Sequence, residues 1–527
     1  MADYVIVGAG SAGCVLAERL SARHSVVLIE AGDNANALEV KVPAAFSKLF
    51  KTGRDWNYSS AAEPDAEDRS LYLPRGRMLG GSSSINAMLY VRGRPSDYDG
   101  WAEAGAHGWN WDIVRQVFID MESNSRGRDQ HHGDSGPVRV EDQRAPNPVT
   151  RAFIDAAVDW GVPANHDFNG DTQDGVGLFQ VTQKRGRRWS AADAFLSAAM
   201  RRPTLQVITR ALVSRIVFDA GRAVGVEYRG EAGIGRVMAD REVILSAGAF
   251  GSPHLLQLSG VGSREHLADL GIEVEVDLPG VGANLQDHPV VPVMYDSLRP
   301  GTLDDSENTV EKLRWLLFRS GRLTSPVAEA GIFVRSDTEL TEPDLEFHFG
   351  PCAFESHGLK PYPGHAFTIG PVLINPRSRG RVLATSPDPS IPPRIEVNCL
   401  REPEDIAALV AGVEIAREIA SRPPLDSFRG VEKLPGRSVV GTDALVDYVR
   451  KRVELIYHPV GTCRMGSDER SVVDPELRVR GVEGLRVVDA SVMPKVTSGN
   501  TNAPTLMIAE RAARMILGGQ SSNGSSG

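Results

Sequence analysis

Cysteines are few in this sequence, and none is placed to form a pair. Cys14, Cys352, Cys399 and Cys463 are scattered over 527 residues with no CxxC motif. The pattern therefore indicates neither a disulfide framework nor a zinc site, and we expect no metal. Because the first apolar strand begins at residue 3, it leaves no room for a signal peptide, and we expect a cytoplasmic location.

Long hydrophobic runs and an excess of positive charge are also missing. No stretch of about 18 apolar residues occurs, so the sequence predicts no integral membrane segment. A location peripheral to the membrane stays open, although no basic amphipathic helix can be read. The formal net charge of −10, with 58 basic against 68 acidic residues, argues against a nucleic-acid partner. Aromatic residues make up only 6% of the chain, which gives no hint of an aryl or sugar platform.

A glycine-rich turn between two apolar runs is the most informative feature that is present. Residues 3–7 read as a buried strand and lead into Gly-Ala-Gly-Ser-Ala-Gly at 8–13, followed by an amphipathic stretch. A second apolar run at 25–29 ends on Glu30. Strand, glycine turn, helix, strand and acid follow one another at the spacing of a dinucleotide-binding βαβ unit. The simpler alternative is a glycine-rich turn in an ordinary α/β protein.

The glycines of this turn would have separate roles in such a unit. Gly8 would allow the tight turn, Gly10 the approach of the backbone to a pyrophosphate, and Gly13 the close packing of helix on strand. The helix N-terminus would face the phosphates, because its free N–H groups and dipole favour anions. Glu30 would accept hydrogen bonds from ribose hydroxyls.

The length of the chain and the change of pattern along it predict two domains. A chain of 527 residues is too long for one core. Strand-like runs at 204–218, 223–229, 243–245 and 485–488, with a helix at 506–517, fit the dinucleotide unit. The middle of the chain mixes polar loops with strand-like runs, which predicts an antiparallel sheet with covering helices. The predicted fold class is therefore α/β (α+β overall), with a Rossmann-like domain assembled from separated segments.

Further segments narrow the choice of cofactor and chemistry. They are RGRMLGGSSSINAMLYVRG at 75–93, GAFGSPHLLQLSGVG at 248–262, YHPVGTCRMG at 457–466, DASVMP at 489–494 and GNTNAPT at 499–505. Together with the glycine turn they closely resemble the glucose–methanol–choline (GMC) family of FAD-dependent alcohol oxidoreductases, over essentially the whole ordered chain. Within that family they look most like the bacterial choline- and alcohol-dehydrogenase branch.

The resemblance implies the oxidation of a primary alcohol to an aldehyde, with hydride transfer from the carbinol carbon to the flavin. His458 matches the family's active-site histidine, and Asn502 matches its second active-site position. Histidine has an ordinary pKa of ~6.5, which suits a base that takes the hydroxyl proton. The amide of Asn502 could donate a hydrogen bond to the substrate oxygen, but it could not share the role of the base.

The resemblance also implies FAD as the cofactor, held without a covalent bond. Ile85 occupies the position at which some relatives carry a histidine linked to the flavin, and isoleucine cannot form that bond. The residues expected to bind FAD are Gly8, Gly10, Ser11, Ala12, Gly13, Glu30, Ala31, Arg77, Gly81, Asn86, Met88, Val213, Asp489, Ala490, Thr501 and Asn502. The expected division is an FAD-binding domain of 1–155, 204–290 and 445–517, a substrate-binding domain of 156–203 and 291–444, and a disordered tail at 518–527.

Several alternatives stay open at the level of sequence. A dehydrogenase that passes electrons to a quinone or another acceptor is favoured over an oxidase that reduces O2 to hydrogen peroxide, on the branch resemblance alone. A lyase with a non-redox flavin and a flavin-binding protein without activity are the remaining interpretations. A homo-oligomer is compatible with the family.

Four other side chains admit a functional and a structural interpretation. Glu329 could reach the substrate pocket and hold a cationic substrate, or it could be a structural acid. His131, His132 and His166 could suggest a metal site, but they lie in polar segments with Gly and Asp. We therefore interpret these histidines as solvated loop residues.

Overall fold

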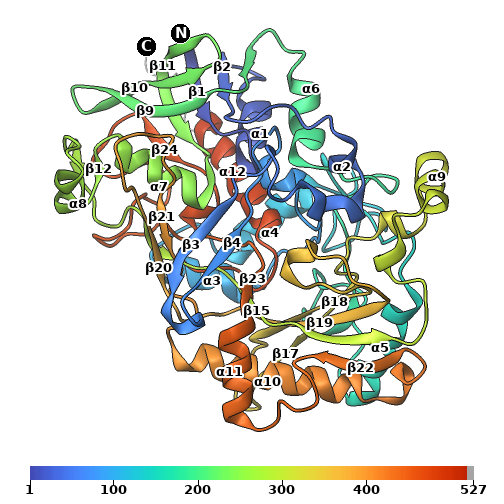
Figure 1. Cartoon of the computed structure of the whole chain (residues 1–527). Helices are drawn as coiled ribbons and strands as arrows, with labels where there is room; N and C mark the ends of the chain where they lie inside the picture. The colour runs from blue at the N-terminus through green and yellow to red at the C-terminus, as the bar shows by residue number, and fades with distance from the viewer. Residues whose placement is uncertain (519–527) are drawn as a thin grey trace.

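Two sheets of different construction organise residues 1–518, which are the residues that the computed structural model describes (Figure 1). The first sheet is parallel at its centre. Its parallel strands are β8 (Leu205–Ile208), β2 (Val26–Ile29), β1 (Ala2–Val7), β11 (Gly233–Leu245) and β24 (Leu485–Val487). All four residues of β2 and five of the six in β1 are buried, as expected of a parallel sheet that is covered on both faces.

The long strand β11 joins the parallel sheet to an antiparallel extension. Its second half pairs with β1, and its first half pairs with β10 (Arg222–Gly230), which in turn pairs with β9 (Leu212–Asp219). Helix α1 (Ser11–Leu20) packs on the sheet and against α12 (Asn502–Gly518), so the two ends of the described chain lie side by side. The Rossmann-like fold expected from the glycine turn is confirmed.

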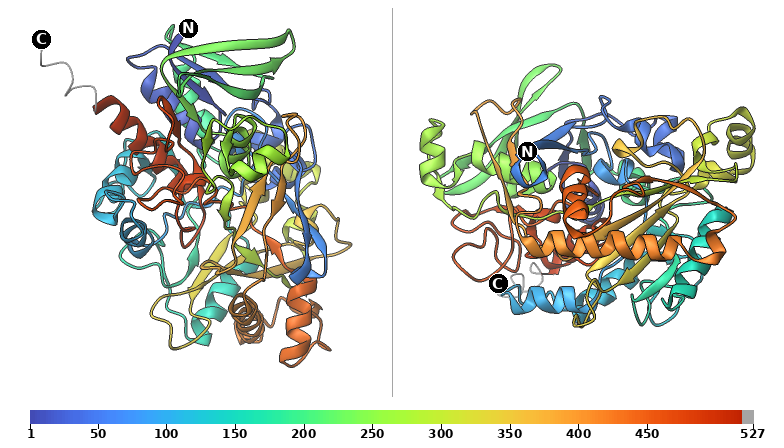
Figure 2. Two further views of the ribbon diagram at one scale, coloured as in Figure 1. Left: turned by 90° about the vertical axis from the view of Figure 1, so that its left-hand side faces the viewer. Right: turned by 60° about the horizontal axis from the view of Figure 1, so that its bottom comes forward.

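The second sheet is antiparallel throughout. Its order is β22 (Arg429–Leu434), β16 (Val293–Ser297), β19 (Ala366–Leu373), β18 (Leu345–Gly350), β17 (Ala330–Val334) and β7 (Gly175–Leu178), with β15 (Pro289–Val290) bridging β19 to β23 (Glu454–Leu455). Its covering helices are α5 (Pro148–Trp160), α10 (Pro403–Ala420) and α11 (Thr442–Arg452), which Figure 2 shows at the end of the molecule away from the first sheet. The expectation of an antiparallel sheet with covering helices is confirmed.

Shorter elements connect and flank the two sheets. They are α2 (Leu38–Lys41), η1 (Pro43–Leu49), β3 (Tyr58–Glu63), β4 (Arg69–Leu73), α3 (Pro95–Glu103), α4 (Trp111–Met121), β5 (Glu122–Asn124), β6 (Val138–Val140), η4 (Ala192–Leu196), α6 (Ser197–Ala199), α7 (Gly248–Leu258), β12 (Val261–Gly262), α8 (Arg264–Asp269), β13 (Val276–Asp277), β14 (Ala283–Leu285), α9 (Thr309–Phe318), η6 (Arg322–Thr324), β20 (Gly380–Leu383) and β21 (Arg394–Glu396).

The expected domain boundaries do not coincide with the ends of elements. The boundary after residue 155 falls inside α5, and that after residue 444 falls inside α11; both helices pack with α10 on the antiparallel sheet. Residues 192–199 pack on α1 rather than with the second sheet. The division into two domains stays a prediction, with these segments reassigned. Of the expected tail at 518–527, only Gly518 lies within the described residues, at the end of α12.

Candidate functional site

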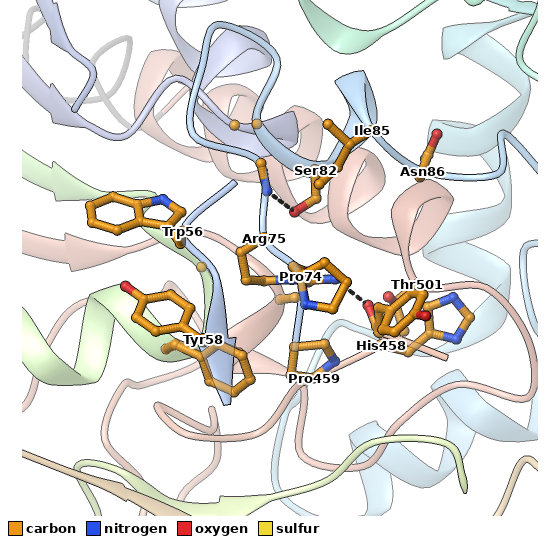
Figure 3. Close-up of a pocket in the computed structure, with 18 of the residues that line it drawn as sticks. Trp56, Tyr58, Pro74, Arg75, Ser82, Ile85, Asn86, His458, Pro459 and Thr501 are labelled. Carbon is orange, nitrogen blue, oxygen red and sulfur yellow. Dashed lines mark hydrogen bonds between the residues drawn. The ribbon is translucent and has the colours of Figure 1, made fainter. Parts of the chain in front are cut away.

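A cavity of about 510 Å³ lies where the two sheets meet. Its walls come from both ends of the chain and from the second sheet, including the β1–α1 turn, the segment at 74–89, the start of α7 and the start of α12. Figure 3 shows part of this wall, with Trp56 and Tyr58 on one side of the view and His458 and Thr501 on the other. Two parts of the cavity differ in what lines them. After the expectations from the sequence, we call the part at the β1–α1 turn the dinucleotide end and the part around His458 the alcohol end.

The dinucleotide end consists of the β1–α1 turn and the end of β2, and it is built mainly from backbone. Gly8 has φ +96°, and a Cβ there would meet the carbonyl of Ser246. A Cβ on Gly13 would overlap the carbonyl oxygen of Gly8, so helix and strand approach as closely as expected. A Cβ on Gly81 would lie only 2.7 Å from the Cα of Gly10. These glycines are therefore required by close contacts of the backbone.

Glu30 lies at the end of β2 and lines the same part of the cavity. Its carboxylate accepts hydrogen bonds from the backbone N–H groups of Ala9 and Gly32, at 2.9 and 2.8 Å. Burial raises the pKa of Glu30 to about 7, against the lowering effect of these two hydrogen bonds. The first turn of α1 follows Gly10, which caps it without a side-chain hydrogen bond. Its N–H groups therefore remain available to an anion.

Most other residues expected to bind the cofactor also line the cavity. They are Gly8, Gly10, Ser11, Ala12, Ala31, Gly81, Asn86, Met88, Val213, Asp489, Ala490, Thr501 and Asn502, together with Ile85. Gly13 does not line the cavity, but it lets α1 pack closely on the β1–α1 turn. Arg77 was also expected to bind the cofactor, but it does not line the cavity. Its guanidinium lies 5.0 Å from the ring centre of Trp56, and it is Trp56 that faces the cavity. Arg77 therefore supports the wall instead of lining it.

The alcohol end surrounds His458, which follows β23. Its Nδ1 atom lies 3.0 Å from Nδ1 of His288, and its Nε2 atom lies 3.2 Å from the amide nitrogen of Asn500. Its backbone N–H donates to a carboxylate oxygen of Asp287 at 2.7 Å. Both ring nitrogens and the backbone of His458 are thus held by neighbours from two distant segments.

These contacts favour one tautomer of His458. An amide N–H can only donate, so Nε2 of His458 must accept from Asn500. The proton of the neutral ring is then on Nδ1, from which it is donated to Nδ1 of His288. Burial lowers the pKa of His458 well below its ordinary value, and the positive charges that His288, His348 and Arg75 can carry lower it further. The ring is therefore neutral, with the lone pair of Nε2 directed toward Asn500.

The structure differs from the expectation for the residue that accompanies His458. Asn502, which was expected to accompany His458, begins α12, and its side-chain oxygen accepts a hydrogen bond from the Ser11 hydroxyl at 2.7 Å. The residue beside His458 is Asn500. Both asparagines belong to the motif GNTNAPT, and sequence spacing alone does not tell which one precedes the helix and which begins it. Asn502 connects the two helix starts that line the dinucleotide end.

Sequence reasoning missed several residues around His458. Asp287 and His288 come from the segment QDHP, about 170 residues before His458, and both are buried. Arg75 donates from its guanidinium to the backbone carbonyl of Tyr457 at 2.6 Å. His348 lines the cavity from the middle of β18. No motif spacing links these positions, because the contacts are made between side chains of separate elements.

Aromatic side chains gather around the alcohol end despite their low number in the chain. Phe46 and Phe50 come from η1 and its end, and their rings lie 5.6 Å apart. Phe354 lies 6.4 Å from Phe46, and Tyr457 lies 5.8 Å from Phe50. All four line the cavity, as does Val327. An apolar wall therefore stands next to the polar group of His458 and Asn500.

Of the two interpretations of Glu329, the structure supports the structural acid, because Glu329 does not line the cavity. Only 1% of it is exposed, and its carboxylate accepts hydrogen bonds from the Asn147 backbone and the hydroxyls of Thr150 and Ser325. Burial raises its pKa, although these hydrogen bonds act in the opposite direction. Glu329 fixes the start of α5 to the strand β17, and it is a structural acid.

His132 is one of the three histidines that were interpreted as solvated, and the structure contradicts this interpretation. It is 1% exposed, and its ring nitrogens lie 2.9 Å from Glu122 and 2.6 Å from Asp167. Burial alone would lower the pKa of His132, but the hydrogen bonds to Asp167 and Glu122 outweigh it and raise the pKa to about 9. Arg92 completes the network through Glu122 at 2.7 Å.

Residues 1–518 contain no candidate metal site and no candidate membrane-spanning helix. No group of three or more His, Cys, Asp or Glu side chains in this range is arranged to hold a metal ion. No helix in it is both long and apolar enough to cross a membrane. The four cysteines are buried and free.

Comparisons with known proteins identify the family. The N-terminal model of the GMC oxidoreductase family matches residues 2–290, and the C-terminal model matches residues 376–509. An alcohol dehydrogenase [acceptor] from Pseudomonas putida is 44% identical over 98% of this chain and 96% of its own length. An oxygen-dependent choline dehydrogenase from Sinorhizobium fredii is 43% identical over the same shares.

Solved structures agree with this result. A pyridoxine 4-oxidase from Mesorbium loti has a TM-score of 0.91 and 33% identity, covering 98% of this chain and 99% of that one. A formate oxidase variant from Aspergillus oryzae has a TM-score of 0.93 and 28% identity, covering 99% of both chains. The resemblance found in the sequence is confirmed, and the chain belongs to the GMC oxidoreductase family.

Proposed function

We propose that the cavity binds FAD non-covalently and that the chain oxidises a primary alcohol to an aldehyde, with His458 as the base. The geometry at His458 carries this proposal, since the Nε2 atom of a neutral imidazole has its lone pair next to the Asn500 amide, and both side chains line the cavity. FAD, when bound, supplies the acceptor for the hydride that leaves the carbinol carbon.

The residues at the dinucleotide end fit FAD. The α1 N-terminus carries no side-chain cap, which leaves N–H groups for a pyrophosphate. Gly10 and Gly81 lie so close that only glycine fits at Gly81, which keeps the wall smooth for a large ligand. Ile85 lines the cavity and has no nucleophilic atom, which supports non-covalent binding. Glu30 has lone pairs left for hydroxyl donors.

His458 would take the hydroxyl proton of the alcohol on Nε2. Its lowered pKa keeps it unprotonated at neutral pH, so it is ready to accept. The hydrogen bond from Nδ1 to His288 holds the ring orientation and would strengthen as Nε2 gains a proton. The amide of Asn500 would donate to the substrate oxygen, which becomes more negative as its proton leaves.

We infer that the electron acceptor is a quinone or another acceptor rather than O2. The support is the Pseudomonas putida relative, which is named as an alcohol dehydrogenase [acceptor]. An alcohol oxidase that forms hydrogen peroxide is the second candidate, because two solved neighbours are named as oxidases. A lyase with a non-redox flavin is the third candidate, and anaerobic reduction of the flavin followed by admission of air separates all three.

The test is an anaerobic absorbance titration of the purified holoenzyme with a panel of primary alcohols that includes choline. We expect one class of alcohol to remove the absorbance of oxidised flavin. His458→Ala should keep the flavin and lose roughly 10²- to 10⁴-fold in the rate of this change. Slow recovery on admission of air supports a dehydrogenase, whereas fast recovery with hydrogen peroxide supports an oxidase. Protein that binds FAD but responds to no alcohol would contradict the proposed oxidation.

A further inference from the structure

Helix α9 exposes a set of large apolar side chains to solvent. Its ten residues run from Thr309 to Phe318, and only Glu311 and Trp315 are buried. The exposed fractions are 72% for Val310, 51% for Leu313, 54% for Leu316, 66% for Leu317 and 70% for Phe318. No other helix within residues 1–518 contributes more than one exposed large apolar side chain. Contiguous exposure of this kind marks an interaction surface.

Hydrogen bonds and packing hold α9 in place, so the exposure of its apolar side chains belongs to the folded structure. The indole N–H of Trp315 donates to the carbonyl of Gly186 at 2.9 Å, and its ring packs with Val42 and Leu323. Asn308 caps the helix by accepting from the Glu311 backbone N–H at 3.0 Å. Figures 1 and 2 show α9 at the outer edge of the molecule.

Positive charges flank this apolar surface. Lys312 and Arg314 lie on α9, Arg319 caps its end, and an adjoining loop that includes Gly186 presents Lys184, Arg185 and Arg187. Apart from Arg314, which lies 3.9 Å from Glu311, these six cations make no ion pair within residues 1–518. They are unbalanced on a chain whose net charge is −10.

The acids near α9 are already engaged. Glu311 lies 3.4 Å from Arg322, and Asp305 pairs with the same guanidinium. Glu307 lies 2.6 Å from Lys48. Arg322 and Lys48 offset two of these three acids, and the six cations outnumber the one that is left, so the net charge around the exposed apolar side chains is positive.

We propose that α9 docks this protein on an anionic phospholipid surface. Its leucines and Phe318 would enter the boundary of the acyl chains, while the flanking lysines and arginines would contact the headgroups. An exposed apolar helix bordered by Lys and Arg is the composition of helices that lie in the membrane interface. Anionic lipids attract such cations close to the surface. A symmetric contact with a second copy would instead bring the same cations together, which opposes it.

The docking surface adjoins the alcohol end of the cavity. Val42 packs against Trp315 of α9. It is followed directly by η1, and Phe46 and Phe50, in and just after η1, line the cavity. In the other direction, α9 leads through η6 to Val327 in the same wall. If the proposed function holds, docking brings the alcohol end next to a lipid phase in which apolar alcohols and quinones dissolve.

The test is flotation of the holoenzyme with phosphatidylcholine vesicles, with and without about 30% phosphatidylglycerol. We expect binding to the anionic vesicles, weak binding to phosphatidylcholine alone, and release at high salt. The variant Leu317→Gln/Phe318→Gln should lower the partition coefficient roughly ten- to hundred-fold. Arg185→Gln/Arg187→Gln should lower it roughly five-fold for each charge removed. Ile234→Gln, at an equally exposed site on the β11 hairpin, is the matched control and should bind as the wild type.

Three results would overturn the proposal. They are wild-type protein that does not float with anionic vesicles, an α9 variant that binds as well as the wild type, and a wild-type dimer that the variant loses while neither binds vesicles. Flavin reduction by a short-chain alcohol without lipid should be the same in the wild type and the α9 variants. A failure of that reaction in the wild type would concern the proposed function alone.

Discussion

The two ends of the cavity are built in different ways. The dinucleotide end comes largely from one continuous stretch, β1–α1–β2, in which glycine backbones touch one another and Glu30 binds backbone N–H groups. The alcohol end gathers His458, Asn500 and His288 from separate segments, and side chains hold it together. A site made from local backbone leaves a motif in the sequence, whereas a site made from distant side chains leaves isolated residues.

The largest expected effect on flavin binding and stability is at the dinucleotide end, where close backbone contacts leave no space for an added side chain. In Gly13→Ala, the new Cβ would overlap the backbone carbonyl of Gly8, and a backbone atom cannot move aside as a side chain can. We expect loss of bound flavin and a lower melting temperature. Flavin absorbance per protein and thermal unfolding measure both. Gly53→Ala is the control, because nothing lies within 4 Å of its Cβ position. Normal flavin content in Gly13→Ala would remove the distinction between the two ends.

The next effect distinguishes the two asparagines. Asn500→Ala removes the donor beside Nε2 of His458, and we expect kcat to fall roughly 10²-fold with the flavin retained. Asn502→Ala removes the acceptor for the Ser11 hydroxyl, so it should weaken flavin binding and leave chemistry less affected. Rapid-reaction kinetics and flavin dissociation measure the two quantities. The reverse pattern would return the catalytic role to Asn502.

A smaller effect is expected at His288, which positions His458. His288→Leu removes the partner of Nδ1, and we expect kcat/KM to fall about ten-fold, as for one buried hydrogen bond. His288→Gln should restore part of the rate, since its side-chain oxygen can accept from Nδ1–H. Equal rates in both variants would indicate a packing role only.

The pH profile gives an independent reading of the same site. The base must be neutral to act, and burial lowers the pKa of His458 well below 6.5. A lowered pKa keeps a base neutral to lower pH, so the fall of kcat/KM on the acid side should lie below pH 6.5 in the wild type. A fall centred at or above pH 6.5 would show that the ring is more solvated than this structure indicates.

The sequence predicted the fold class, the family and the dinucleotide end because these depend on periodicity and on glycine positions. It also singled out His458, whose motif is compact and whose side chain lines the cavity. It missed Asp287 and His288, since only the antiparallel sheet brings them to His458. It placed Asn502 where Asn500 lies, because the start of α12 decides which of the two side chains lies beside His458 and which lies beside Ser11.

Other errors came from burial, which no local pattern revealed. His132 lies in a polar segment and was expected to be solvated, yet tertiary packing covers it and pairs it with Glu122 and Asp167. The exposed face of α9 was also missed. In the sequence, its leucines resemble an ordinary core helix, and only the structure shows that Trp315 alone of its large apolar side chains faces inward.

The smallest effect on activity is expected at Glu329, which the sequence suggested for the alcohol end. In Glu329→Gln, one of the donors from Asn147, Thr150 and Ser325 would face an amide N–H instead of a carboxylate oxygen. A buried group left without its partner costs roughly 1–3 kcal/mol of folding free energy. The melting temperature should therefore fall, while the ratio of kcat/KM for choline to that for a neutral alcohol stays the same. A change in this ratio, without loss of stability, would place Glu329 at the substrate. The alcohol end would then include a residue that the sequence suggested for it, and the two ends of the cavity would differ less in how far the sequence predicts them.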